Sequence, residues 1–218
     1  MKLKQQILCT AALFLFFLTS ACSIAENGPP GLLPAPEEQS PPSQEHDNVQ
    51  PDEPDSGLQV HTGSTISMET TIEGMTEEVK VVEYTLTPAG IQYHLRVLMG
   101  SPSVEGGQVV YQRAMGEGTA ELMVEVLEET PLEEAAGKAQ HTLQQKGFTP
   151  GQTEKVPQEL NGYEGTRQSF LHEDQIHGYY AFDIEASCLI IYYSYPAEAA
   201  DGMGAVMHEM LQSISIED

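Results

Sequence analysis

Two histidines lie close enough in this sequence to act on one ligand, in the segment His172-Glu173-Asp174-Gln175-Ile176-His177. If residues 173–175 form a tight turn, the two imidazoles flank it and can approach each other, as the ligands of a transition metal do. A zinc site needs at least a third protein ligand, and the local sequence has no clear one. We therefore favour a polar β-turn with exposed histidines over a metal site, and we predict no metal.

A second group of metal-capable side chains lies near the C-terminus: Met203, Met207, His208 and Met210. Thioethers suit Cu(I). However, the three methionines are spaced four and three residues apart, which places them on one face of a helix. We interpret them as core residues and predict no cofactor.

Four tyrosines in two adjacent pairs give the best indication of a binding surface: Tyr179, Tyr180, Tyr192 and Tyr193. Adjacent residues of a strand point to opposite faces of a sheet, so some of the four are expected on the less buried face. Exposed aromatic side chains are typical of partner sites. We favour ordinary half-buried sheet packing for them, and a surface for an extracellular protein partner is the alternative.

No sequence pattern indicates nucleophilic catalysis. Cys188 lies in an apolar run with no neighbouring base, so we expect a core residue rather than a nucleophile. The sequence contains no Gly-x-Ser-x-Gly, no glycine-rich phosphate loop and no His-Glu-x-x-His motif. We therefore predict no catalytic residue and a protein that is not an enzyme.

The N-terminus has the order of a secretory signal. Lys2 and Lys4 precede an apolar core, and small residues lead to Cys22. The apolar run is shorter than the roughly 20 residues of a membrane span. The small residues followed by Cys22 resemble the lipobox of bacterial lipoproteins. The resemblance implies a signal peptide at 1–21 and a diacylglycerol on Cys22, which would anchor the chain to the extracytoplasmic face of a cell membrane.

Residues 22–57 have the composition of a disordered tether. They contain eight of the 14 prolines, eight acidic residues and no lysine or arginine. Few apolar residues are present to offset the entropy of ordering, and proline favours an extended chain of about 3.1 Å per residue. We expect a spacer that holds the following domain away from the membrane.

The charge of the chain argues against one class of partner. With 33 acidic residues against nine lysines and arginines, the formal net charge is −24. Such a charge repels phosphate backbones, so we predict no nucleic-acid binding.

Residues 58–218 are enough for one domain with its own core. Apolar and β-branched runs, separated by turn residues, predict strands. The expected strands are 65–72, 79–87, 91–99, 109–114, 122–127, 163–171, 176–184 and 189–195. The short connections at 173–175 and 185–187 predict that the last three form an antiparallel meander.

Two helices complete the prediction. Thr130, Pro131 and Glu133 predict an N-cap, a first helical residue and a capping box. Apolar residues at helical spacing extend this helix to Lys146, and Gly147 follows as its C-cap. A second helix is expected at 198–213. The fold class is therefore α+β: an antiparallel sheet packed by two helices after a disordered tether.

The second half of the domain resembles the PsbP-like fold family. The matching features are the helix 132–146, the segment 156–165 leading into a strand, the runs Tyr179-Tyr180-Ala181-Phe182 and 190–196, and the closing helix. The resemblance implies a PsbP-like sandwich and supplies no active-site residue to carry over, and a cystatin- or NTF2-like cone is the competing architecture. We expect a non-catalytic binding or scaffold module held outside the membrane. The alternative is a lipoprotein that binds a small ligand or metal in a pocket between sheet and helix.

Overall fold

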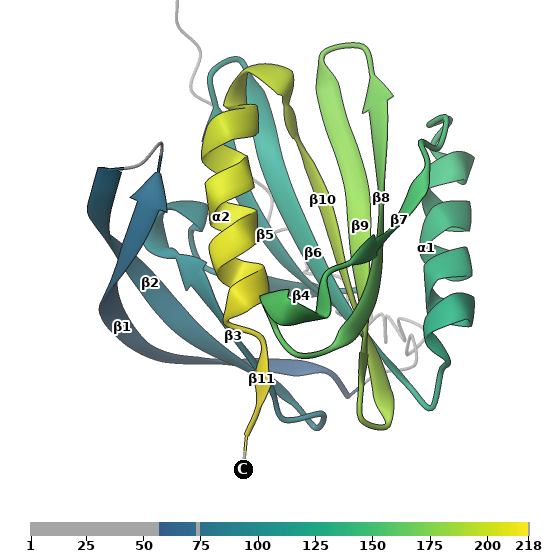
Figure 1. Cartoon of the computed structure of the whole chain (residues 1–218), viewed down its shortest axis with the longest axis horizontal. Coiled ribbons are helices and arrows are strands. Elements are labelled where there is room, and N and C mark those ends of the chain that lie inside the picture. The colour runs from purple at the N-terminus through teal and green to yellow at the C-terminus, as the bar shows by residue number, and fades with distance from the viewer. Residues whose placement is uncertain (1–56, 73–74, 218) are drawn as a thin grey trace, which may run out of the picture. The chain divides into compact units, whose positions relative to one another are not determined.

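The strands form where β-branched and aromatic residues are dense, and they assemble into two antiparallel sheets (Figure 1). The computed structural model describes residues 57–72 and 75–217. The predicted signal peptide at 1–21, the lipidation site Cys22 and nearly all of the tether at 22–57 lie outside the described residues, so these remain predictions from the sequence.

The smaller sheet has four strands in the order β1-β2-β3-β11. They are β1 (Gln59–Ile72), β2 (Met75–Thr87), β3 (Ile91–Arg96) and β11 (Ser215–Ile216). The predicted turn between the second and third strands is confirmed, with Gly90 in the left-handed region at φ +67°. The prediction for 91–99 was partly wrong, because the strand ends at Arg96 and Val97–Met99 form a 3₁₀ turn.

The larger sheet has seven strands in the order β4-β5-β6-β10-β9-β8-β7. They are β4 (Ser103–Glu105), β5 (Gln108–Met115), β6 (Gly118–Glu128), β7 (Thr153–Val156), β8 (Glu164–His172), β9 (Gln175–Ile184) and β10 (Ser187–Pro196). The predicted meander of the last three strands is confirmed by their antiparallel registers. Its two tight turns begin at Glu173 and Glu185, with φ of 52° and 55°.

The first helix, α1 (Leu132–Gln145), ends as the sequence predicted but begins differently. At its end, Gly147 donates to Gln144 O at 2.9 Å and Phe148 to Leu143 O at 3.3 Å, which is the Schellman pattern. The predicted capping box was wrong. The Thr130 hydroxyl donates to the Glu128 carbonyl, and Pro131 takes the N-cap position without a side-chain hydrogen bond.

The second helix, α2 (Ala200–Gln212), follows a 3₁₀ turn at Ala197–Ala199. Helix α1 covers one face of the larger sheet. Helix α2 covers the other face, on the side of the smaller sheet (Figure 1). None of the helices in the described ranges is long and apolar enough to cross a membrane.

Strand β10, in the middle of the larger sheet, shows how the core is divided. Cys188, Ile190 and Tyr192 pack with α1, and the alternate residues Leu189 and Ile191 pack with α2 and the smaller sheet. Both faces of the strand are covered, which is why its sequence is a continuous apolar run rather than an alternating one.

The predicted α+β class, with antiparallel strands and two helices, is therefore confirmed. The sequence predicted a single sheet packed by the two helices. The described strands instead divide between two sheets. The first three strands pair with one another in the smaller sheet, and Gly100 follows their 3₁₀ turn at φ +81°. The next strands join the meander through the β6–β10 ladder.

Candidate functional site

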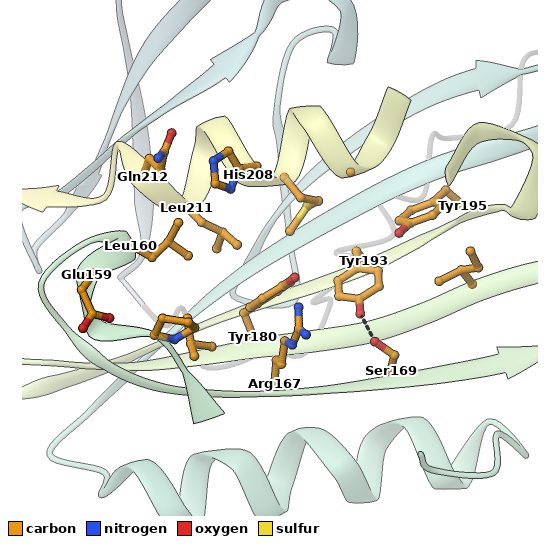
Figure 2. A pocket seen from close by; sticks show the side chains of 15 residues that line it. Glu159, Leu160, Arg167, Ser169, Tyr180, Tyr193, Tyr195, His208, Leu211 and Gln212 are labelled. Atoms are coloured by element: carbon orange, nitrogen blue, oxygen red, sulfur yellow. Dashed lines mark hydrogen bonds between the residues drawn. The ribbon is translucent and has the colours of Figure 1, made fainter. Parts of the chain in front are cut away.

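A cleft of about 650 Å³ lies between α2 and the larger sheet (Figure 2). Strands β8, β9 and β10 supply its floor. Helix α2 supplies one wall, and the segment from Val156 to Leu160 supplies the other. We call this space the α2 cleft. Its volume lies within the roughly 300–1,000 Å³ of ligand pockets in proteins.

Three tyrosines from neighbouring strands form the aromatic part of the floor: Tyr180, Tyr193 and Tyr195. The rings of Tyr180 and Tyr193 have centroids 5.7 Å apart, and those of Tyr193 and Tyr195 are also 5.7 Å apart. Tyr193 and Tyr195 share a face because they are two residues apart on one strand. The result is a run of aromatic rings with hydroxyl groups at their edges.

A glycine in the sheet makes this arrangement possible. Gly178 lies in register between Ser169 on β8 and Tyr193 on β10. A Cβ atom at position 178 would lie 2.5 Å from the Gln168 carbonyl oxygen and would collide with the Tyr193 hydroxyl. Without it, the Tyr193 hydroxyl reaches across the strand to the Ser169 hydroxyl at 2.8 Å.

Arg167 is the cationic group of the floor. It lies two residues before Ser169 on β8, and therefore on the same face. Its Nε and Nη2 donate to one oxygen of Glu154, at 2.8 and 2.5 Å. The hydrogen bond with Glu154 raises the pKa of Arg167, and the interaction with Tyr180 raises it further. Arg167 and Tyr180 lie near the middle of the cleft, with Glu159 and Tyr195 toward opposite ends (Figure 2).

The α2 wall consists of Gly204, Met207, His208, Leu211 and Gln212. Their spacing of three, one, three and one residues places them on one face of the helix. Gly204 has no other atom within 4 Å of where its Cβ would be, so the wall is open there. Apolar side chains therefore face the aromatic floor across the cleft, and His208 lies on the helix above it (Figure 2).

Burial determines the protonation of the floor. It raises the pKa of Tyr193 and of Tyr195 above the ordinary tyrosine value. The hydroxyls of both side chains are therefore neutral near pH 7 and can donate as well as accept hydrogen bonds.

The structure separates the four tyrosines that the sequence singled out. Tyr179 and Tyr192 pack on the α1 side of the larger sheet, with 1% and 2% of their surface exposed. Tyr193 is 6% exposed on the α2 side, where Tyr180 is partly buried. The four do not form one exposed surface, because both faces of their strands are covered. Only Tyr180 and Tyr193 meet in the α2 cleft.

The two other groups of candidate ligands occupy ordinary packing positions. Phe148 stacks on His177 with ring centroids 3.9 Å apart and lies 5.6 Å from His172. Burial lowers the pKa of His177, and His172 and Lys146 lower it further. Met203, Met207 and Met210 are buried, as predicted. No cluster of three or more His, Cys, Asp or Glu side chains suited to a metal occurs in 57–72 and 75–217.

Cys188 is fully buried, in agreement with the prediction of a core residue. Burial raises the pKa of its thiol to about 12, with a further contribution from Asp183. The thiolate is therefore scarce near neutral pH, which suits packing rather than nucleophilic attack.

A second hollow, of about 560 Å³, lies on the opposite face of the sheet, between α1 and strands β7 and β8. Leu132, Ala136 and Gly137 form its helical side, and Thr166 and Tyr179 belong to the sheet. It contains no counterpart of the Arg167 cation or of the row of three tyrosines. The α2 cleft is therefore the stronger candidate.

Sequence reasoning missed Arg167, Ser169 and Gly204. The lining comes from five separate segments that meet only in the folded domain, so no local motif marks it. One signal was available: the 204, 207, 208 and 211 positions have helical spacing. The cleft itself corresponds to the pocket between sheet and helix that was considered as an alternative.

Comparisons with known proteins give a likeness among solved structures. No family model matches the sequence, and no curated protein matches it. Among solved structures, the chain is similar to cyanobacterial PsbP (CyanoP) from Synechocystis sp. PCC 6803, a member of the family that the sequence resembles. The match covers 63% of this chain and 92% of CyanoP, with 12% identity and a TM-score of 0.46.

Proposed function

We propose that this protein is a non-catalytic ligand-binding lipoprotein, anchored through Cys22 at the extracytoplasmic face of a membrane, and that its ligand site is the α2 cleft. The observation that carries the proposal is the combination of volume and lining. A cleft of about 650 Å³ places three tyrosines and one arginine opposite a helix face that carries Met207 and Leu211 beside His208 and Gln212. Mostly apolar walls with a few convergent polar groups are typical of small-molecule sites.

The packing of the tyrosines favours a small ligand over the protein partner expected from the sequence. A protein partner needs exposed side chains to contact, and Tyr179, Tyr192 and Tyr193 are each at most 6% exposed. A small molecule can instead enter the cleft, which is lined by the partly buried Tyr180 and by Tyr193. Tyr180 and Tyr193 are therefore better placed to contact a small molecule than a protein partner.

The chemistry of the floor favours binding over catalysis. A general base works best with a pKa near the ambient pH, whereas burial raises the pKa of Tyr193 and Tyr195. The guanidinium of Arg167 stays protonated beside Glu154. These groups can fix the orientation of a ligand, but they are poorly suited to exchanging protons with it.

A matched pair of glycine substitutions tests the site. Gly204 lines the α2 cleft, and Gly202 on the same helix does not. Neither has an atom within 4 Å of where its Cβ would be, so Gly204→Phe and Gly202→Phe should both fold. We expect small molecules that raise the melting temperature of the full-length protein to lose this effect with Gly204→Phe and keep it with Gly202→Phe. Equal loss or equal retention in the two variants would refute the cleft as the site.

Substitution of Cys22 tests the anchor separately. Cys22→Ser removes the sulfur to which the lipid would be attached. We expect the wild-type protein in the membrane fraction and Cys22→Ser outside it, with a mass difference that corresponds to acyl chains. An unmodified Cys22 in the mature wild-type protein would contradict the anchor while leaving the cleft proposal intact.

A further inference from the structure

Arg167 gives the middle of the α2 cleft a set of hydrogen-bond donors. Within the described residues, Arg167 commits Nε and Nη2 to Glu154, while Nη1 makes no hydrogen bond to a carboxylate. A guanidinium has five N–H donors and no acceptor. The hydrogen bonds to Glu154 therefore leave N–H groups of Arg167 available to a ligand.

The hydroxyl groups around Arg167 extend this donor set. Tyr180 interacts with the Arg167 cation. A hydroxyl oxygen that accepts from a cation directs its own hydrogen elsewhere. One of the Tyr193 and Ser169 hydroxyls donates to the other at 2.8 Å, and the second hydroxyl of the pair can donate its hydrogen to a ligand. These groups converge near the middle of the cleft (Figure 2).

The remaining lining is mainly apolar, with His208 and Gln212 as its polar residues on α2, and its one acidic residue is displaced from the donors. Leu160 and Ile176 line the floor side, and Met207 and Leu211 face them from α2. Glu159 lies toward one end of the cleft, away from Tyr193 and Tyr195 (Figure 2). A ligand that fits both features has an apolar body and an acceptor group.

We propose that the α2 cleft binds a small organic carboxylate with an apolar body, whose carboxylate accepts hydrogen bonds from Arg167 and the Tyr180 hydroxyl. The inference rests on the function proposed above and specifies its ligand class. Carboxylates match the planar guanidinium fork and form charge-assisted hydrogen bonds with it. The apolar body lies against the tyrosine rings and the α2 wall.

Three probes with the same phenyl group and chain length separate the ligand classes: 4-phenylbutyrate, 4-phenylbutanamide and 4-phenylbutylamine. Their dissociation constants are measured by calorimetry on the full-length protein in lipid nanodiscs. We expect the carboxylate to bind about tenfold more tightly than the amide, as for a charge-assisted hydrogen bond at a partly exposed site. The amine should bind more weakly still.

Arg167→Met tests the residue that confers the preference. Arg167 and Glu154 are both about half exposed, with 46% and 52% of the side chains accessible, so the variant should fold. We expect the preference for the carboxylate to fall close to one, with the amide still bound. Arg113→Met, which removes an exposed arginine outside the cleft lining, should keep the preference.

The outcomes distinguish this inference from the function on which it rests. Equal binding of the three probes, tighter binding of the amine, or no binding of the carboxylate at millimolar concentration would each overturn the carboxylate assignment. A carboxylate preference that survives Arg167→Met would overturn it as well. The proposed function fails on a different result, namely ligands whose binding is unaffected by Gly204→Phe.

Discussion

Replacing Glu209 with glutamine tests whether a buried ion pair holds α2 against the smaller sheet. Arg96 on β3 donates from Nε to Glu209 Oε2 at 2.6 Å and from Nη2 to Glu209 Oε1 at 2.5 Å. The side chains of Arg96 and Glu209 are 12% and 4% exposed. This two-pronged contact joins the helix that forms one wall of the α2 cleft to a strand more than 100 positions earlier in the chain.

The size of the effect follows from the burial. Removing one partner of a buried ion pair costs about 3–5 kcal/mol, because the other charge stays buried without compensation. Glutamine keeps one oxygen that can accept from Arg96, so we expect Glu209→Gln to lower the free energy of unfolding by about 3 kcal/mol. For a chain of this size, the melting temperature should fall by about 6–12 °C.

The other arginine–glutamate pair is a matched control. Arg167 and Glu154 also approach to 2.5 Å, but their side chains are 46% and 52% exposed. Exposed pairs contribute about 0–1 kcal/mol, so Glu154→Gln should change stability by no more than that. Denaturant unfolding of both variants gives the comparison. If the two losses agree within about 1 kcal/mol, burial does not set the strength of the Arg96–Glu209 contact, and the reasoning is refuted.

The same pair predicts the pH dependence of the effect. Burial alone raises the pKa of Glu209, but hydrogen bonds from Arg96 and Thr70 outweigh it, and the pKa lies below the ordinary 4.5. A carboxyl with a lowered pKa in the folded state stabilises the protein above its unfolded pKa, and this contribution is lost as the pH falls through the folded value. The difference between wild type and Glu209→Gln should therefore be constant from pH 7 to about 5 and shrink below about pH 4.5.

Three further substitutions or modifications test the packing around the sheet. Gly178→Ala brings a methyl group 2.5 Å from the Gln168 carbonyl oxygen and should cost about 1–3 kcal/mol in denaturant unfolding; an unchanged midpoint would contradict the close approach. Tyr111→Phe leaves the buried Tyr93 hydroxyl without its 2.7 Å partner and should cost about 1–3 kcal/mol, of which the Tyr93→Phe/Tyr111→Phe double variant recovers part. The Cys188 thiol, whose pKa burial raises to about 12, should resist N-ethylmaleimide at pH 7.5 until urea unfolds the protein; rapid labelling of its peptide in the native state would show that the thiol is accessible.

Local patterns predicted most of the elements. The meander could be predicted because its turns are short and polar. Helix α1 could be predicted because Ala135, Ala139 and Leu143 repeat at helical spacing. The start of α1 was misread because Thr130 bonds to Glu128 instead of capping the helix. A threonine can satisfy either partner, and the sequence does not say which one it contacts.

The division into two sheets and the α2 cleft could not be predicted in the same way. Strand periodicity indicates which face of a strand is buried, but not which strands pair. The cleft depends on the register that places Gly178 between Ser169 and Tyr193. It also depends on α2 lying over that register, which is a long-range contact. Because the residues that line the cleft come from several segments, no single segment contains a motif that identifies the site.

The most direct test of the central claim is to locate the bound probe by methyl NMR on the full-length protein, with 4-phenylbutyrate as the ligand. Met207 and Leu211 line the α2 cleft, whereas Leu132 lines the hollow on the α1 side of the sheet. The account predicts saturable shifts of the Met207 and Leu211 methyl resonances and none for Leu132. Shifts centred on Leu132, or saturable binding that leaves Met207 and Leu211 unchanged, would contradict the claim that the α2 cleft is the binding site.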